Sequence, residues 1–490
     1  MSTKPLIVVL VHGWSVTNTN TYGNLPDRLM EDARKNKFPI DIRNIHLGKY
    51  VSFDDEVRLE DLSRGFAAAL ERDLGLGGRF ACITHSTGGP VIRDWWHRYY
   101  PLEDSRQCPM SHLVMLAPAN FGSALAQLGK GRLSRLKSWF DGVEPGTGVL
   151  DWLELGSPES WDLNRRWIQG EFTRRVRTTY PFVLTGQSID RALYDHLNSY
   201  TAETGSDGVV RVASANLNAT YVKLVQGTLE ERTSSGAIPL KLESFATAPP
   251  TPLAVIPGRS HSGEKMGIIR SIQNNNQPHP TVGRLMECLA VANEVDYTKV
   301  IAKFEMDTEN VMNAERVEAR TWGPFDGYEF HDPCSMIIFR VQDDHGRTVE
   351  DFDLLLTGGP DGNPDHLPEG FFIDRQKNRR APGTLTYFLN HSRMTGDNAF
   401  KVGRKIVRPA LKGQTHLGLR LTARPENGYV SYMPAELVSS QAVLNLFVKP
   451  NQTTIVDIVM RRIIGEGVFL LTEDRQFKDF SNQKVGPPLV

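Results

Sequence analysis

Residues 79–89 of the chain read RFACITHSTGG, and residues 90–96 continue as PVIRDWW. An apolar run typical of a strand leads directly into Ser86, and a stretch of helical character follows at once. This is the pattern of a nucleophile elbow, a sharp turn between strand and helix that presents a serine hydroxyl for chemistry. Gly88 keeps the second glycine of the Gly-x-Ser-x-Gly signature, while Thr84 replaces the first. We therefore interpret Ser86 as a catalytic nucleophile rather than a loop serine.

The order of elements in the first 304 residues predicts a mainly parallel sheet. Strand-type runs alternate with helical stretches such as residues 58–74, and this alternation favours parallel pairing through right-handed crossovers. Two insertions interrupt it: residues 122–178 are of helix and loop type, and residues 212–247 contain two strand-like runs expected to pair as a hairpin. The expected strands are residues 5–11, 40–46, 80–84, 112–117, 181–185 and 252–256.

After residue 304, short β-type runs alternate with turn-forming clusters of glycine, proline and aspartate. This spacing predicts an all-β, sandwich-like domain. We expect an α/β domain over residues 1–304 and a β-rich domain over residues 305–490, with a partly helical linker at 305–320. The β-type runs are residues 335–341, 351–356, 384–389, 417–422, 443–448 and 453–460.

The composition is that of an ordinary globular protein, with 40% hydrophobic and 23% charged residues among 490. A formal net charge of −1 argues against nucleic acid as a partner. No run has the length of a membrane-spanning helix or the pattern of a signal peptide, and the four cysteines show no disulfide or metal spacing. We expect synthesis in the cytoplasm, with export by a signal-peptide-independent secretion system left open.

A serine nucleophile in acyl transfer also needs donors for the oxyanion that develops on the substrate. One donor is the backbone N–H of the residue after the nucleophile, here Thr87. The other comes from the loop after an earlier strand, here residues 11–14 (VHGW), in which the N–H of Trp14 is the natural donor. His12 and His85 are interpreted as packing residues without a catalytic role.

Together these motifs resemble those of α/β-hydrolases of the lipase type. The resemblance implies an α/β-hydrolase fold, an acyl-enzyme intermediate, no cofactor, and a triad in the chain order serine, acid, histidine. The segments that carry it are residues 11–14 (VHGW), 84–88 (THSTG), 117–123 (APANFGS) and 206–210 (SDGVV).

The acid of the triad is expected after the strand that follows the long insertion. Asp207 lies in residues 205–210 (GSDGVV), whose glycines permit a tight loop and which resemble the acid loop of many lipases. Asp190, which comes sooner after the strand, and Asp195 are the alternatives.

The base is expected after the last strand of the sheet. His261 lies there, in residues 257–263 (PGRSHSG), whereas His279 follows in a polar stretch and His196 precedes Asp207 and so breaks the family order. Oriented by Asp207, His261 is expected to take the proton of Ser86 and return it to the leaving alcohol.

The insertion at 122–178 is expected to form a lid, because insertions at this place in lipases cover an apolar acyl pocket. Basic and apolar residues interleave in it, with Leu133, Leu136 and Phe140 on one helical face and a second apolar group at residues 149–155. An interfacial lid would place the apolar groups in lipid and Lys and Arg near phosphates, giving peripheral membrane contact. The alternative is that these residues pack on the core.

The sequence therefore predicts a serine carboxylic-ester hydrolase acting on lipid or phospholipid esters. Turn carboxylates such as Asp343 and Asp361 are weighed as calcium ligands, although solvated turn residues are the usual case. Similar lipases use an appended β domain to dock to lipid, a protein partner or delivery machinery, and an antibacterial effector is one such setting. The alternatives are a thioesterase, amidase or acyltransferase of the same fold, or a binding and delivery protein whose functional part is the β domain.

Overall fold

The computed structural model describes residues 4–11, 22–45, 56–75, 78–104, 106–128, 147–172, 178–190, 203–275, 277–322 and 325–465. Contacts within the chain divide it into two compact units. The α/β unit comprises residues 1–219, 247–336 and 450–453. The β unit comprises residues 220–246, 337–449 and 454–490.

The α/β unit is built on a six-stranded sheet with the order β2-β1-β3-β4-β5-β8. Every neighbouring pair is parallel, as the alternation of strands and helices predicted. Its inner strands are buried on both faces, which explains their nearly continuous apolar runs. The strands are β1 (Leu6–Val11), β2 (Ile40–Ile45), β3 (Phe80–His85), β4 (Met110–Leu116), β5 (Tyr180–Thr185) and β8 (Leu253–Val255).

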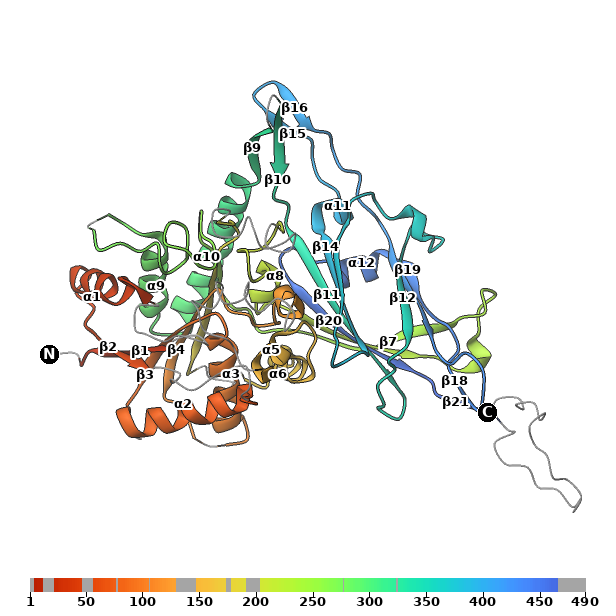
Figure 1. The fold of residues 1–490 in the computed structure, drawn as a ribbon, viewed down its shortest axis with the longest axis horizontal. Helices are drawn as coiled ribbons and strands as arrows, with labels where there is room; N and C mark the ends of the chain where they lie inside the picture. Colours follow the sequence, from red (N-terminus) through yellow and green to blue (C-terminus); the bar gives the residue numbers. More distant parts are fainter. Residues whose placement is uncertain are drawn as a thin grey trace, which may run out of the picture. The chain divides into compact units, whose positions relative to one another are not determined.

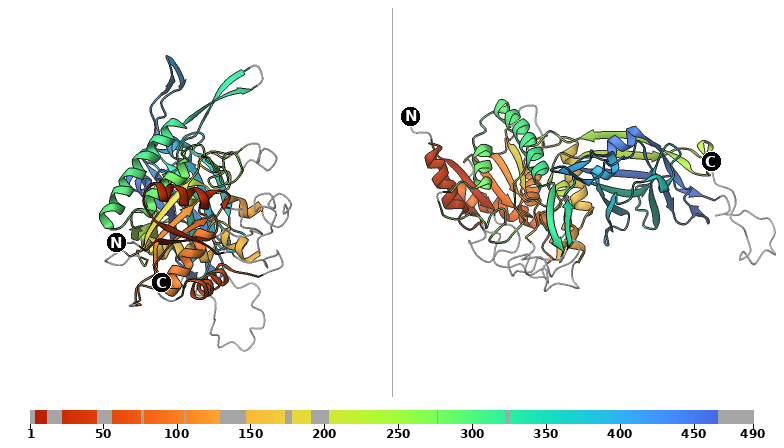
Figure 2. Two further views of the ribbon diagram at one scale, coloured as in Figure 1. Left: turned by 90° about the vertical axis from the view of Figure 1, so that its left-hand side faces the viewer. Right: turned by 90° about the horizontal axis from the view of Figure 1, so that it is seen from above.

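Helices cover both faces of this sheet (Figures 1 and 2). Side chains of α1, α9 and α10 join one buried cluster with alternate residues of the strands. On the other face α2 packs against α3, where the rings of Phe66 and Trp95 meet edge to face with centroids 5.1 Å apart. These helices are α1 (Leu25–Lys35), α2 (Leu59–Leu74), α3 (Gly88–Tyr99), α9 (Pro280–Leu289) and α10 (Glu294–Ala314). Shorter elements are η2 (Ala124–Leu128), α5 (Thr147–Leu153), α6 (Pro158–Ile168) and α8 (Val212–Ala215).

Residues 305–320 do not form a free linker, because most of them belong to α10. This helix packs along β8, its residue Phe304 is fully buried, and the hydroxyl of Tyr297 donates to the Pro181 carbonyl at 2.8 Å. An antiparallel hairpin, β9 (Val317–Trp322) and β10 (Phe325–Phe330), follows it.

The β unit contains a nine-stranded mixed sheet with the order β12-β17-β19-β7-β6-β20-β11-β14-β13. The two strand-like runs expected between residues 212 and 247 are β6 and β7, which lie side by side in it. The sequence pattern predicted this pair, but not that it would join the sheet of the C-terminal strands. The strands are β6 (Thr220–Gln226), β7 (Ile238–Thr247), β11 (Cys334–Asp343), β12 (Phe352–Gly358), β13 (Phe372–Lys377), β14 (Thr384–Asn390), β17 (Leu417–Ala423), β19 (Ala435–Ser440) and β20 (Thr453–Met460). Smaller elements are η5 (Leu229–Glu231), η6 (Pro364–His366), α11 (His391–Thr395), β15 (Phe400–Val402), β16 (Lys405–Arg408), β18 (Val430–Ser431), α12 (Gln441–Phe447) and β21 (Ile463–Ile464).

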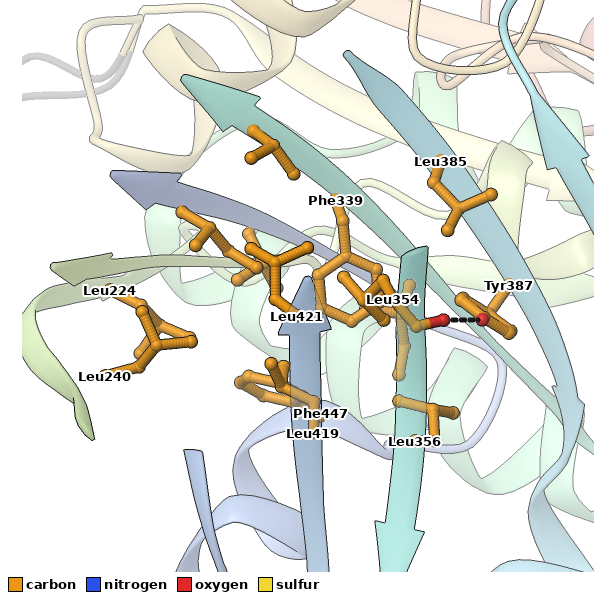
Figure 3. Close-up of a cluster of buried hydrophobic side chains, with 14 of the residues drawn as sticks. Leu224, Leu240, Phe339, Leu354, Leu356, Leu385, Tyr387, Leu419, Leu421 and Phe447 are labelled. Atoms are coloured by element: carbon orange, nitrogen blue, oxygen red, sulfur yellow. Dashed lines mark hydrogen bonds between the residues drawn. The ribbon is translucent and has the colours of Figure 1, made fainter. Parts of the chain in front are cut away.

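This sheet curls around its own apolar core (Figure 3). Strands β12 and β14 are far apart in the strand order, yet the hydroxyl of Tyr387 on β14 donates to the Leu354 carbonyl on β12 at 2.7 Å. Buried side chains from both ends of the sheet, among them Phe339 and Leu421, belong to one cluster. The layering is therefore sandwich-like, although its strands form one hydrogen-bonded sheet.

One predicted strand is wrong: residues 443–448 belong largely to helix α12. The Ser440 side chain accepts a hydrogen bond from the Val443 N–H and caps the helix, and Leu444 and Phe447, three residues apart, share its buried side. A short apolar run fits strand and helix equally well, and here the cap decides.

Candidate active site

Ser86 lies in the turn between β3 and α3. Its φ of 53° is left-handed, a conformation that costs a non-glycine residue about 1–2 kcal/mol. The Ser86 N–H donates to the carbonyl of Leu116 at the end of β4 at 2.9 Å, and the Gly89 N–H donates to the Ser86 carbonyl at 3.2 Å. Backbone bonds thus hold a strained serine in place, as expected where a turn presents a side chain for chemistry.

Gly89, just after the turn, is closely packed against a neighbouring loop. A β-carbon there would stand 2.8 Å from Cβ of Pro118, in the loop after β4. Gly89 therefore lets α3 begin directly against that loop. The glycine of the signature, Gly88, is the first residue of α3.

Three predicted site residues from distant parts of the sequence meet beside the elbow. Nε2 of His261 lies 3.1 Å from Oγ of Ser86, and Nδ1 of His261 lies 2.9 Å from Oδ2 of Asp207. Asp207 is fully buried and His261 is 3% exposed, so little water competes for these bonds. An Nδ1–H that donates to the carboxylate leaves Nε2 as the acceptor for the serine proton, which is the tautomer that a general base needs.

Backbone groups fix the orientation of the Asp207 carboxylate. Its Oδ1 accepts the N–H groups of Val209 at 3.0 Å and Val210 at 2.7 Å. The His261 N–H donates to the Asp207 carbonyl at 2.9 Å, which ties the two loops together. Gly208, with φ of 94°, makes the turn that brings these N–H groups to the carboxylate.

An ion pair, which we call the acid-loop clasp, joins Glu203 and Arg211 on either side of Asp207. Arg211 donates to both carboxylate oxygens of Glu203, with Nε and Nη2 each 2.7 Å from their partners. Both side chains are buried. The Val212 N–H donates to the Gly205 carbonyl at 2.8 Å, so the loop is closed by backbone and side chains together. No motif in the sequence had singled out this pair.

The other residues considered for the triad take different places. Asp190 is buried after β5, but the carboxylate that bonds to His261 is that of Asp207. Nδ1 of His279 accepts from the Thr281 N–H at 3.3 Å and caps α9. Burial and then the neighbouring arginines lower the pKa of His279 to about 4, so its ring is neutral at pH 7. The remaining alternatives, Asp195 and His196, lie outside the described residues.

Of the two predicted oxyanion donors, the structure describes Thr87 but not Trp14. Thr87 is buried directly after Ser86 at the N-cap of α3, where the helix dipole is positive. Trp14 lies outside the described residues, together with His12 and Gly13. The strand before that loop ends at Val11, whose carbonyl accepts the hydroxyl of Tyr22 at 2.6 Å.

His85 lies against the ring of His261, with ring centroids 4.9 Å apart and planes inclined by 39°. His85, which the sequence indicates as a packing residue, packs on the side chain of the predicted base. Its position directly before Ser86, at the end of β3, was the one signal available.

Arg93, in the second turn of α3, is fully buried without a carboxylate partner in the described structure. Its Nη1 donates to Oδ1 of Asn120 at 3.1 Å and its Nη2 to Oδ1 of Asn164 at 3.0 Å, while its guanidinium stands over the ring of Trp167. Burial lowers the pKa of Arg93 to about 9. Asn120, part of the APANFGS motif, also donates to the Ala215 carbonyl at 2.7 Å, so this network links the elbow helix to the segment after Asp207.

Part of the predicted lid packs inside the α/β unit. The apolar group at residues 149–155 (Val149, Leu150, Trp152, Leu153 and Leu155) is buried. The basic and apolar segment with Leu133, Leu136 and Phe140 lies outside the described residues.

Among the residues that the structure describes, no group of three or more His, Cys, Asp or Glu is arranged to hold a metal ion. The buried Asp343 instead accepts the N–H groups of His345 and Arg347 and the guanidinium of Arg462. Within the same residues, no helix is both long enough and apolar enough to span a bilayer.

Comparison with solved structures finds phospholipase PlaB from Legionella pneumophila, 41% identical to this chain with a TM-score of 0.85; the match covers 99% of this chain and 100% of that one. A structure of the same phospholipase in complex with thio-NAD is 40% identical, with a TM-score of 0.84 and the same coverage. Bacillus licheniformis lipase BlEst2 is 20% identical over 44% of this chain and 80% of its own, with a TM-score of 0.31. No family model and no curated protein matches the chain.

Proposed function

The chain belongs to the family of phospholipase PlaB, and we propose that it hydrolyses the carboxylic esters of phospholipids through an acyl-enzyme formed on Ser86. The α/β-hydrolase fold with a β-rich C-terminal region, predicted from the sequence, is confirmed by this membership, and so is the prediction of a serine ester hydrolase. The proposal adds the substrate class and the residues that perform the reaction.

The observation that carries the proposal is the continuous line of bonds from Asp207 through His261 to Ser86. Nε2 of His261 takes the proton as Oγ of Ser86 attacks the ester carbonyl. The buried Asp207 stabilises the imidazolium that forms, and the N–H groups of Thr87 and Trp14 receive the oxyanion. His261 then gives the proton to the leaving alcohol, and water, activated by the same base, releases the fatty acid.

The test is hydrolysis of phosphatidylcholine and phosphatidylglycerol vesicles, followed by mass spectrometry of the lipids. We expect Ser86→Ala to lower kcat by roughly 10⁴- to 10⁶-fold, the size seen when a serine nucleophile is removed. Ser235→Ala, at an exposed serine, is the control and should match the native chain. Short p-nitrophenyl esters and acyl-CoA, assayed in parallel, separate a phospholipase from an esterase or thioesterase. Full activity of Ser86→Ala would rule out the mechanism.

The finer setting of the activity belongs to the same proposal. The basic residues of the 122–178 insertion would contact an anionic lipid surface, and the β-rich domain would dock to a partner or to delivery machinery. Sedimentation with anionic and zwitterionic vesicles tests the first part: a chain with Arg132, Arg135 and Lys137 changed to alanine should lose binding to anionic vesicles only.

A further inference from the structure

Helix α10 hydrogen-bonds to the outer side of β8, the edge strand of the six-stranded sheet. β8 ends the strand order, so in the part of the chain that the structure describes one side of it has no strand to bond. Thr308 of α10 fills this place with a single hydroxyl: Oγ1 accepts the Val255 N–H at 3.0 Å and donates to the Leu253 carbonyl at 2.9 Å. These are alternate groups of one strand edge, the ones that a further strand would bond.

Seven residues later, Glu315 continues the same pattern into the loop that carries His261. Its Oε1 accepts the Gly258 N–H at 2.6 Å, and its Oε2 accepts the side-chain amide of Gln187 at 2.8 Å. Seven residues make two helical turns, about 10 Å along the axis, so Thr308 and Glu315 lie on the same side of α10. One face of the helix therefore follows the chain from β8 to a point three residues before His261.

The place of Glu315 conflicts with the local preference of a helix. It is the C-cap of α10, and a carboxylate at this negative end of the helix dipole is unfavourable. Such a departure from local rules is typical of residues kept for a function elsewhere in the molecule. Here the two charge-assisted bonds to Gly258 and Gln187 offset the conflict.

The contacts of Glu315 join the loop after β5 to the loop that carries His261. The Ser188 N–H donates to the Arg259 carbonyl at 3.0 Å, and a β-carbon on Gly186 would stand 1.9 Å from that same carbonyl oxygen. The two loops are therefore in close backbone contact, and Glu315 bonds to both. A shift of Gly258 would be passed along three residues to the ring of His261, whose Nε2 must stay within bonding distance of Ser86.

We propose that Glu315 is a positioning residue for the reaction: by holding Gly258 and Gln187 it sets the place of the His261 ring relative to Ser86. Thr308 anchors the strand from which this loop departs. The inference rests on the proposed function, because it gives His261 the role of the base.

The test uses the full chain with a soluble p-nitrophenyl ester and a fluorophosphonate that labels the activated serine. The end point of labelling counts the intact sites, and kcat is expressed per labelled site, so a loss of folded protein alone would not change it. Glu315→Ala is expected to lower kcat per site and the labelling rate together by about 10- to 100-fold with KM unchanged, the size of a misplacement on the scale of an ångström. Glu309→Ala, at an exposed carboxylate of the same helix, should leave both rates unchanged.

Exchanging the two side chains, so that glutamine stands at position 315 and glutamate at position 187, tests whether activity can be restored. In Glu315→Gln the bonds to Gly258 and Gln187 lose the charge of the carboxylate, and Gln187 must turn its own amide over to bond the new one, so the rates should fall. Adding Gln187→Glu restores a carboxylate opposite an amide and leaves an oxygen for the Gly258 N–H, so the double variant should recover to within about threefold of the native rates. Such recovery distinguishes positioning from general weakening of the fold, and the exchange also serves where Glu315→Ala does not fold.

Three outcomes separate the inference from the proposed function. If Ser86→Ala is inactive while the Glu315 variants keep native rates per site, only the inference is overturned. If the single variants are slow and the exchange does not recover, the hydrogen bonds are not the cause and the inference is also overturned. If Ser86→Ala itself is active and labelled, the proposed function has failed.

Discussion

Each unit contains a bidentate arginine–carboxylate pair, but the two pairs lie in different structural surroundings. In the β unit Arg340 bonds to Asp457 at 2.6 and 2.9 Å, and the two belong to neighbouring strands of a regular sheet. In the α/β unit the clasp of Arg211 and Glu203 joins the two sides of an irregular loop around a buried carboxylate. The first pair adds to a sheet whose geometry the backbone hydrogen bonds already determine, whereas the second pair helps to determine the conformation of its loop.

The difference extends to the rest of each unit. The β unit buries one large apolar cluster (Figure 3). The α/β unit holds a serine at positive φ, a buried arginine bonded to two asparagines, and a buried carboxylate at the tip of a loop. Backbone strain and buried polar groups cost free energy, and they are typical of sites whose geometry is not the one that packing alone would favour. Four substitutions test whether the geometry of the site depends on the α/β unit alone, while the β unit contributes to stability.

Asp207→Asn should have the largest effect. The amide would favour the wrong tautomer of His261, and we expect kcat on a soluble ester to fall by roughly 10⁴-fold with the fold intact. Asp190→Asn, at the other buried aspartate considered for the triad, should stay within about threefold of native. The reverse result would move the acid to Asp190. Steady-state kinetics with circular dichroism as the folding control measures both.

Phe339→Ala should act on stability alone. Phe339 is fully buried in the cluster of the β unit, and removal of such a ring costs about 3–5 kcal/mol. Urea unfolding measures the loss. Below the unfolding transition, fluorophosphonate labelling of Ser86 should proceed at the native rate. A labelling rate that falls with stability would mean that the β unit takes part in shaping the site.

His112 should make the α/β unit acid-sensitive. Burial lowers the pKa of His112 to about 4, below the usual 6.5, and outweighs the bond to the Val291 carbonyl, which favours the charged ring. Its contribution is therefore complete above pH 6.5 and lost as the pH falls toward 4, by about 3 kcal/mol in the free energy of unfolding.

Unfolding measured between pH 7 and pH 4 tests this contribution of His112. His112→Gln should flatten the dependence on pH, while His345→Gln, at an exposed histidine of the β unit, should leave it unchanged. Equal slopes for the native chain and His112→Gln would contradict the prediction.

Arg211→Lys should give the smallest of these effects and the most direct comparison. Lysine keeps the charge but cannot bond to both oxygens of Glu203 at once. We expect kcat to fall by about tenfold through a looser acid loop. Arg340→Lys makes the same change in the β unit and should leave kcat at the native value. If the two variants behave alike, the clasp has no special relation to the site.

The sequence predicted the residues proposed for the triad but not the residues that hold their loops in place. Ser86 was recognisable because strand, turn and helix are contiguous, and Asp207 and His261 because each lies in a short glycine-containing loop at a defined place in the chain order. Glu203, Arg211 and Glu315 were not, because their partners are set by how loops return to one another, for which no local pattern exists. Residues 305–320 were expected to form a partly helical linker because α10 buries few side chains, with Tyr297, Phe304 and Thr308 spread over its 21 residues.

The hydroxyl of Thr308 has a consequence beyond the loop that it anchors. An open strand edge is a template on which a strand of another molecule can add, the first step of many ordered aggregates. At β8 the outward N–H of Val255 and carbonyl of Leu253 are already bonded within the chain. A single threonine thereby occupies the two backbone groups that an added strand would bond at this edge of the sheet.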